Sequence, residues 1–112
     1  MTVVGTPSPF GSRARTQALL AIQLLTESYP RELARLLRIS LSSVQKGLQS
    51  LEEDGLVVAR SVGRTRVFRL NPRAFGLVEL TRYLDRLLER ENGLRSRAEN
   101  LRRRPRRTGK PL

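Results

Sequence analysis

The sequence predicts a mainly α fold with a small β-hairpin, which belongs to the α+β class. Four stretches repeat apolar residues at the three- and four-residue spacing of amphipathic helices. Two short strand-like segments, residues 56–60 and 66–70, directly follow one of these helices and flank a turn that contains glycine. The 112 residues suffice for one domain with a small core.

An N-terminal segment and a first helix precede the helix and strands just described. Residues 1–11 contain two glycines and two prolines, so we expect a flexible N-terminal arm. Ser12 can cap a helix over about residues 13–27. Leu20 and Leu24 lie opposite the main apolar face of this helix, and a helix that is apolar on two sides needs two partners. We interpret Leu20 and Leu24 as contacts to a second subunit.

A second, short helix is expected over residues 30–37, because proline suits the first helical position. Arg31, Arg35 and Arg38 recur at four- and three-residue spacing and therefore share one outer stripe. Two interpretations of this stripe stay open. It is either a solvated helix face or a surface that contacts nucleic-acid phosphates.

The third helix, over about residues 41–54, has the most informative outer face. Ser40 is a suitable N-cap, and Gly55 supplies a stop. Short polar side chains and one cation lie outside, and such side chains suit the base edges of a DNA groove. They are Ser42, Ser43, Gln45, Lys46 and Gln49. Gly47 lies inside the helix, where we favour close helix packing over close approach to a nucleic-acid backbone.

The predicted hairpin is rich in arginine. Gly63 and Arg64 fit a two-residue turn with glycine in the first position. Arginines on an edge strand commonly protect against aggregation. Four arginines on one hairpin beside a polar helix nevertheless favour contact with DNA. They are Arg60, Arg64, Arg66 and Arg69.

A fourth helix is expected from about residue 73 to residue 91, within a C-terminal segment over residues 73–94. Its leucines repeat at 3-4-3 spacing. This stripe can cover the domain or pair with a second copy, and we favour dimerisation. The leucines are Leu77, Leu80, Leu84 and Leu87.

Residues 95–112 contain eight basic residues and a single acid, Glu99. Pro105 and Pro111 oppose a helix there. We expect a disordered basic tail, which would strengthen binding to any polyanion without reading its sequence.

Composition narrows the class of function. The 22 Lys and Arg residues against 10 Asp and Glu give a net charge of +12, which predicts a polyanionic partner. The chain has no cysteine and no histidine, which excludes disulfides, thiolate or imidazole catalysis and the usual soft metal sites. Asp85 and Glu89 share a helix face, but interleaved arginines favour ion pairs over a metal site. We expect no enzymatic activity, no catalytic residues, no cofactor and no metal.

The location of the protein is also predicted from simple patterns. The longest apolar runs are about five residues, far below the length of a membrane span. The first ten residues lack the basic start and apolar run of a secretory signal. We therefore expect no membrane contact and a cytoplasmic, nucleoid-associated location.

The order of the segments carries a family resemblance. Residues 31–37, 40–48, 51–57 and 63–70 follow one another as helix, polar helix, turn and arginine-rich hairpin. In this order they resemble winged-helix transcriptional regulators of the ArsR-like group and, more distantly, MarR-like regulators. The resemblance implies a winged helix-turn-helix domain over residues 12–72, with an additional C-terminal helix.

The resemblance further implies a sequence-specific transcriptional regulator that binds double-stranded DNA as a homodimer. The helix over residues 41–54 would enter the major groove, and the wing over residues 60–66 would contact the backbone or minor groove. The predicted DNA-binding residues are Arg31, Arg35, Arg38, Ser40, Ser42, Ser43, Gln45, Lys46, Gln49, Arg60, Arg64, Thr65 and Arg66. The predicted dimer contacts are Leu20, Leu24, Leu77, Leu80, Leu84 and Leu87.

Two features depart from the family pattern. Metal-sensing members use Cys or His ligands, which this chain lacks. Arg38 stands where the family usually has glycine, so either Arg38 adopts a left-handed conformation or the turn is built differently. The alternative function is a non-specific nucleic-acid-binding or architectural protein driven by its basic tail.

Overall fold

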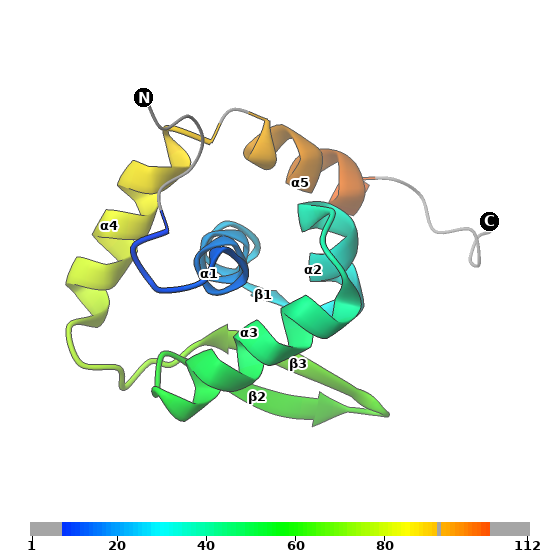
Figure 1. The fold of residues 1–112 in the computed structure, drawn as a ribbon, viewed down its shortest axis with the longest axis horizontal. Coiled ribbons are helices and arrows are strands. Elements are labelled where there is room, and N and C mark those ends of the chain that lie inside the picture. The colour runs from blue at the N-terminus through cyan, green and yellow to red at the C-terminus, as the bar shows by residue number, and fades with distance from the viewer. Residues whose placement is uncertain (1–7, 92, 104–112) are drawn as a thin grey trace.

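The computed structural model describes residues 8–91 and 93–103, and this part contains five helices and one three-stranded antiparallel sheet (Figure 1). The α+β class predicted from the sequence is confirmed. In chain order the elements are α1 (Arg13–Leu25), β1 (Glu27–Ser28), α2 (Pro30–Leu37), α3 (Leu41–Glu53), β2 (Val57–Val62), β3 (Thr65–Leu70), α4 (Leu77–Leu88) and α5 (Leu94–Arg103).

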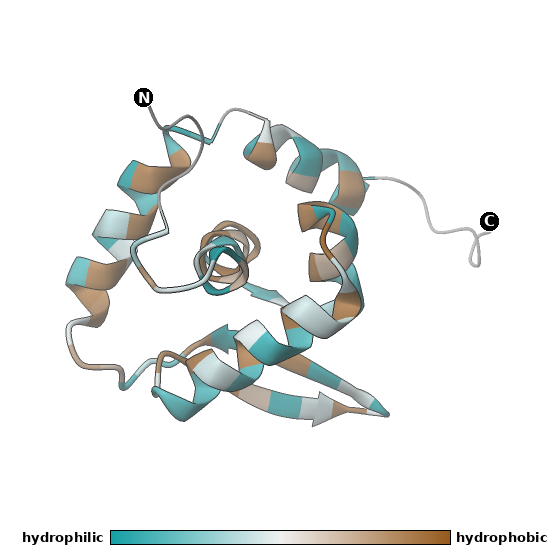
Figure 2. Cartoon of the chain, viewed as in Figure 1, coloured by the Kyte–Doolittle hydropathy of each residue, from teal (hydrophilic) through white to brown (hydrophobic). Residues whose placement is uncertain are grey.

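Helix α1 forms the centre of the fold, with the other four helices and the sheet arranged around it (Figure 1). Residues 16–22 are all buried, and Figure 2 shows this helix as largely apolar. A helix surrounded on every side needs apolar residues on every side. Leu20 is fully buried in the chain's own core, so its predicted role as a subunit contact is wrong. Leu24 is half-buried and packs against the same core.

The two helices of the helix-turn-helix begin and end where local signals place them. The backbone N–H of Ser43 donates to Ser40 Oγ at 3.1 Å and caps α3. Arg38 ends α2 with φ 61° and ψ 42°, a left-handed conformation that is costly for any residue with a side chain. Of the two alternatives left open by the sequence, the structure therefore has the first, in which Arg38 adopts a left-handed conformation.

The sheet has the strand order β1-β3-β2. The hairpin pairs Val57 with Leu70 at its base and Val62 with Thr65 at its tip. Gly63 has a positive φ of 63°, and Arg64 does not have a positive φ. This pattern fits the predicted two-residue turn with glycine in the first position. Strand β1 was not predicted, because two residues are too short to show an alternating pattern.

Helix α4 begins at Leu77 rather than near residue 73. The backbone N–H of Arg73 donates to Asn71 Oδ1 at 2.9 Å, which favours a turn, and Gly76 takes a left-handed conformation just before the helix. The part of the chain that the structure describes has no helix long and apolar enough to cross a membrane.

Helix α5 corrects the prediction of a disordered tail from residue 95. Leu94 and Ala98 are buried, and Leu101 packs against the core, so three residues at 4-3 spacing attach this helix to the domain. The basic segment can fold onto the domain because its arginines either lie toward solvent or form hydrogen bonds to other parts of the chain. The rest of the predicted tail, residues 104–112, lies outside the described residues.

Candidate nucleic-acid interface

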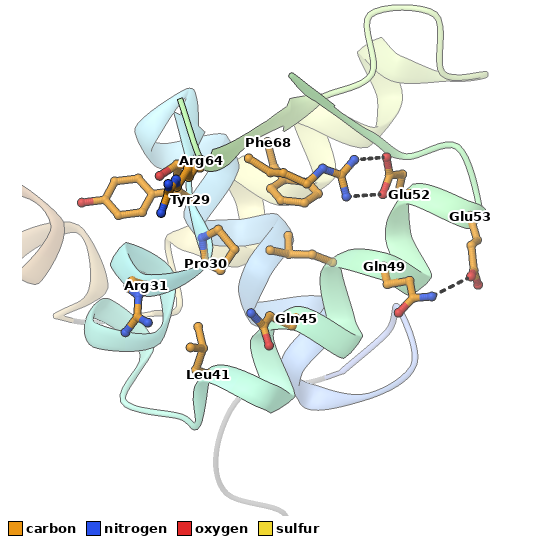
Figure 3. A pocket seen from close by; sticks show the side chains of 13 residues that line it. Tyr29, Pro30, Arg31, Leu41, Gln45, Gln49, Glu52, Glu53, Arg64 and Phe68 are labelled. Atoms are coloured by element: carbon orange, nitrogen blue, oxygen red, sulfur yellow. Dashed lines mark hydrogen bonds and ion pairs between the residues drawn. The ribbon is translucent and has the colours of Figure 1, made fainter. Parts of the chain in front are cut away.

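An open groove of about 700 Å³ lies between the start of α2, the outer side of α3 and the β2–β3 hairpin (Figure 3). Its floor is apolar, because Leu48 and Phe68 continue from the core into it. Gln45 and Gln49 of α3 also line the groove, so the helix offers amide groups along one side. The groove is basic near Arg31 and Arg64 and acidic at the end of α3.

The outer face of α3 is as exposed as the sequence predicts. Val44, Leu48 and Leu51 are buried on its inner side. The predicted base-reading residues are all exposed: Ser42, Ser43, Gln45, Lys46 and Gln49. Ser40 Oγ also donates to Ser43 Oγ at 2.8 Å, so these two hydroxyls serve the helix cap. Gln45, Lys46 and Gln49 remain as the long side chains that this helix presents.

Gly47 lies on the buried side of α3, against α1. A Cβ atom added at this position would lie 3.4 Å from the Ala14 carbonyl carbon and 3.5 Å from Ala14 Cβ. Gly47 therefore lies in the contact between α3 and α1, at distances that are ordinary for a Cβ atom. A nucleic acid on the outer face of α3 would not reach it.

The arginines of the hairpin fall into different environments. Arg64, at the turn, is exposed and lines the groove. Arg66 also faces the groove, but it is held by two hydrogen bonds to Glu52, with Nη2–Oε2 at 2.7 Å and Nη1–Oε1 at 3.3 Å. Its guanidinium lies 5.1 Å from the ring centroid of Phe68, within range of a cation–π interaction.

Arg60 and Arg69 lie on the other face of the sheet. Successive strand residues alternate between faces, and Arg60 pairs across the hairpin with Val67, whereas Arg66 pairs with Ser61. Arg60 Nη2 contacts both carboxylate oxygens of Glu27 at 3.0 Å. The structure therefore does not bring Arg60 together with the groove beside α3. Thr65 is exposed and lines the groove next to Arg64.

Five predicted DNA-binding cations are exposed and have no carboxylate partner among residues 8–91 and 93–103. They are Arg31, Arg35, Arg38, Lys46 and Arg64. Unpaired, solvated cations are available to a polyanion without breaking an internal ion pair.

The carboxylates at the end of α3 limit how a polyanion could lie. Glu52 pairs with Arg66, and Gln49 Nε2 donates to Glu53 Oε2 at 3.4 Å. Asp54 pairs with Arg15 of α1 at 2.8 Å. Like charges repel, so a phosphate backbone is favoured near the start of α3 and disfavoured near its end. No group of three or more Asp, Glu, Cys or His side chains within the described ranges is placed to hold a metal ion.

The predicted dimer contacts are distributed differently from the sequence expectation. Leu84 and Leu87 are buried within this chain, so they are unavailable to a partner, and that part of the prediction is wrong. Leu77 and Leu80 are half-buried. The outer side of α4 and the loop before it instead expose apolar and aromatic side chains that the sequence interpretation missed. They are Phe75, which is fully exposed, Val78 at 58% and Tyr83 at 45%.

No protein-family model matches this sequence, and no curated protein is detectably similar to it. Several solved structures do match. A double mutant of ZitR from Lactococcus lactis has a TM-score of 0.54 and 22% identity, over 73% of this chain and 65% of that one. The adhesin competence repressor AdcR from Streptococcus pyogenes has a TM-score of 0.54 and 23% identity, over 74% and 64%.

A single-substitution mutant of ZitR gives a TM-score of 0.60 at 19% identity, over 88% of this chain and 67% of that one. The present chain thus spans about two thirds of the length of these proteins. At such identities the likeness concerns the fold, and it does not single out the ArsR-like group named in the sequence analysis. These matches, together with the helix-turn-helix and the hairpin, show that the chain has a winged-helix fold.

Proposed function

We propose that this chain is a sequence-specific transcriptional regulator that binds double-stranded DNA. The main supporting observation is the exposed polar face of α3 beside five exposed cations that pair with no carboxylate in the described part of the chain. In this proposal α3 lies in the major groove and the wing contacts the backbone or minor groove. The description of AdcR as a repressor supports the same class of function for this chain.

The residues would divide into two roles. Gln45, Lys46 and Gln49 have the length and the donor groups to contact base edges. The exposed arginines of α2 and Arg64 would bind phosphates and set the register of the protein on the duplex. Arg66 could join them only by leaving Glu52, and Arg60 faces the far side of the sheet.

Competition binding between fragments selected from random duplexes and unselected DNA tests this proposal. Replacing Lys46 and Gln49 by alanine should reduce discrimination between sequences by about 1–3 kcal/mol per lost base contact. Arg64→Ala should weaken binding to all duplexes and lower the salt slope by about one. An equal loss on every sequence from the Lys46 and Gln49 variant would refute base reading.

The alternative is a non-specific nucleic-acid-binding or architectural protein that relies on basic charge near its C-terminus. A deletion that tests it has to start at residue 104, because residues 94–103 form α5 and belong to the folded domain. We expect the shortened chain to keep its preference for selected DNA and to lose affinity uniformly. Complete loss of binding at moderate salt would favour the alternative.

We further propose that the protein is a homodimer and that the outer side of α4 contributes to the interface. Phe75, Val78 and Tyr83 would supply its apolar contacts, together with the exposed parts of Leu77 and Leu80. Replacing Phe75 and Val78 by serine should shift the mass in analytical ultracentrifugation from dimer to monomer without unfolding the chain. An unchanged mass would place the interface elsewhere. We also propose a cytoplasmic location on the nucleoid.

A further inference from the structure

Helix α5 holds α2 at both ends. Arg102 forms two hydrogen bonds to Glu32, in the first turn of α2, with Nε–Oε2 at 2.7 Å and Nη2–Oε1 at 2.8 Å. The same Nη2 donates to the backbone carbonyl of Glu27 at 2.8 Å. At the other end of α2, Arg97 Nε donates to the Leu36 carbonyl at 3.3 Å.

Glu32 is a buried carboxylate whose charge needs this partner. Its side chain is 9% exposed, and within the described part of the chain Arg102 is the cation that pairs with it. Ser28 Oγ donates to Glu32 Oε1 at 2.6 Å and completes its hydrogen bonding. The hydrogen bond to Glu32 is the main reason that the pKa of Arg102 is raised. A buried carboxylate without its cation would be strongly disfavoured, so the position of α2 is coupled to α5.

Arg102 is also linked to the wing, through Glu27. Glu27, whose carbonyl accepts from Arg102, holds Arg60 of β2 through its carboxylate. Arg31, the neighbour of Glu32 in α2, lines the groove beside α3. Glu32 and Arg102 themselves do not line that groove. They lie behind the proposed DNA-binding surface and touch the elements that form it.

We propose that Arg102 is a positioning residue for DNA binding. Its pair with Glu32 fixes α2 relative to α3 and the wing, so that Arg31 and the α3 side chains meet the duplex together. This inference rests on the proposed function and extends the DNA-binding unit beyond residue 72 to the end of α5. Binding requires such preorganisation, because each group that must be ordered on contact lowers affinity.

The direction in which one substitution changes DNA affinity distinguishes this positioning role from a simple effect of net charge. Glu32→Gln removes a negative charge from the protein, so electrostatics alone would tighten binding to DNA. If Arg102 positions α2 through Glu32, the same substitution weakens binding. Arg102→Gln should weaken it to a similar extent, and the double variant should lose no more than either single one, because both act through one pair.

The experiment uses the full-length chain, with duplex affinity measured at several salt concentrations and folding monitored by circular dichroism. We expect Glu32→Gln and Arg102→Gln each to lose about tenfold in affinity, with the salt slope of the wild type, since neither residue contacts phosphate. Arg103→Gln is the matched control, because it removes an exposed charge from the same helix. Its loss should be several-fold smaller than that of Arg102→Gln.

Arg102→Lys provides a milder variant in case the others unfold. Lysine keeps the charge but lacks the two-pronged geometry, so affinity should fall partway while the salt slope stays unchanged. Wild-type affinity in Arg102→Lys, or equal or tighter binding by folded Glu32→Gln, would overturn the inference. A salt slope reduced by about one in Arg102→Gln would also overturn it, because it would indicate direct phosphate contact. If the wild type binds no duplex at low salt, the proposed function itself fails.

Discussion

Replacing Arg38 by glycine should stabilise the protein while weakening its binding to DNA. Arg38 has φ 61° and ψ 42°, and its backbone N–H donates to the Ala34 carbonyl at 2.9 Å, a bond that glycine retains. A left-handed conformation costs a residue with a side chain about 1–2 kcal/mol. Glycine loses about 0.5–1 kcal/mol more backbone freedom on folding. The midpoints of these two ranges differ by about 0.75 kcal/mol (the ranges allow about 0–1.5), and this gain in the free energy of unfolding corresponds to a rise of a few degrees in Tm.

The effect on DNA binding should have the opposite sign. The Arg38 side chain is exposed and has no carboxylate partner in the part of the chain that the structure describes. Its removal should lower affinity for every duplex and reduce the salt slope by about one. A cation that costs backbone stability and pairs with no carboxylate among the described residues is consistent with a role in binding.

Two assays and one control separate these effects. Urea unfolding followed by circular dichroism gives the stability, and titration of duplex DNA at several salt concentrations gives the affinity. Arg38→Ala removes the same charge but keeps the unfavourable backbone, so it should lose affinity without gaining stability. If Arg38→Gly is no more stable than Arg38→Ala, the argument from backbone strain is wrong. If both bind DNA like the wild type, Arg38 contacts no phosphate.

Two further predictions concern α3. Gly47→Ala should raise stability by about 0.5–1 kcal/mol, because alanine favours a helix and its Cβ would meet Ala14 at 3.4–3.5 Å, an ordinary contact distance; a lower urea midpoint would mean that the interface with α1 leaves no room. Glu52→Gln should free Arg66 and raise affinity for random duplexes a few-fold, more than the matched control Glu53→Gln, which frees no arginine. Equal gains in electrophoretic mobility-shift titrations of the two variants would show that only net charge matters.

The sequence predicted the helix-turn-helix and the hairpin well because their signals are local. Pro30 and Ser40 start their helices through their own backbone and side-chain chemistry, and Gly63 permits a tight turn. These effects act over a few residues, so a single sequence displays them. Helix α5 is hard to predict because the apolar pattern that attaches it to the core, Leu94 and Ala98, is short and lies in a strongly basic segment.

The sequence alone determined where the chain turns, which face of each helix is apolar and that the protein carries a large excess of positive charge. Only the tertiary structure decided which apolar residues the core uses, and it placed Leu20 inside rather than between subunits. It also decided which arginines remain free, and it brought Glu32 to Arg102 across 70 residues of chain. Such pairings depend on how the helices pack around α1, and no local pattern in the sequence specifies that packing.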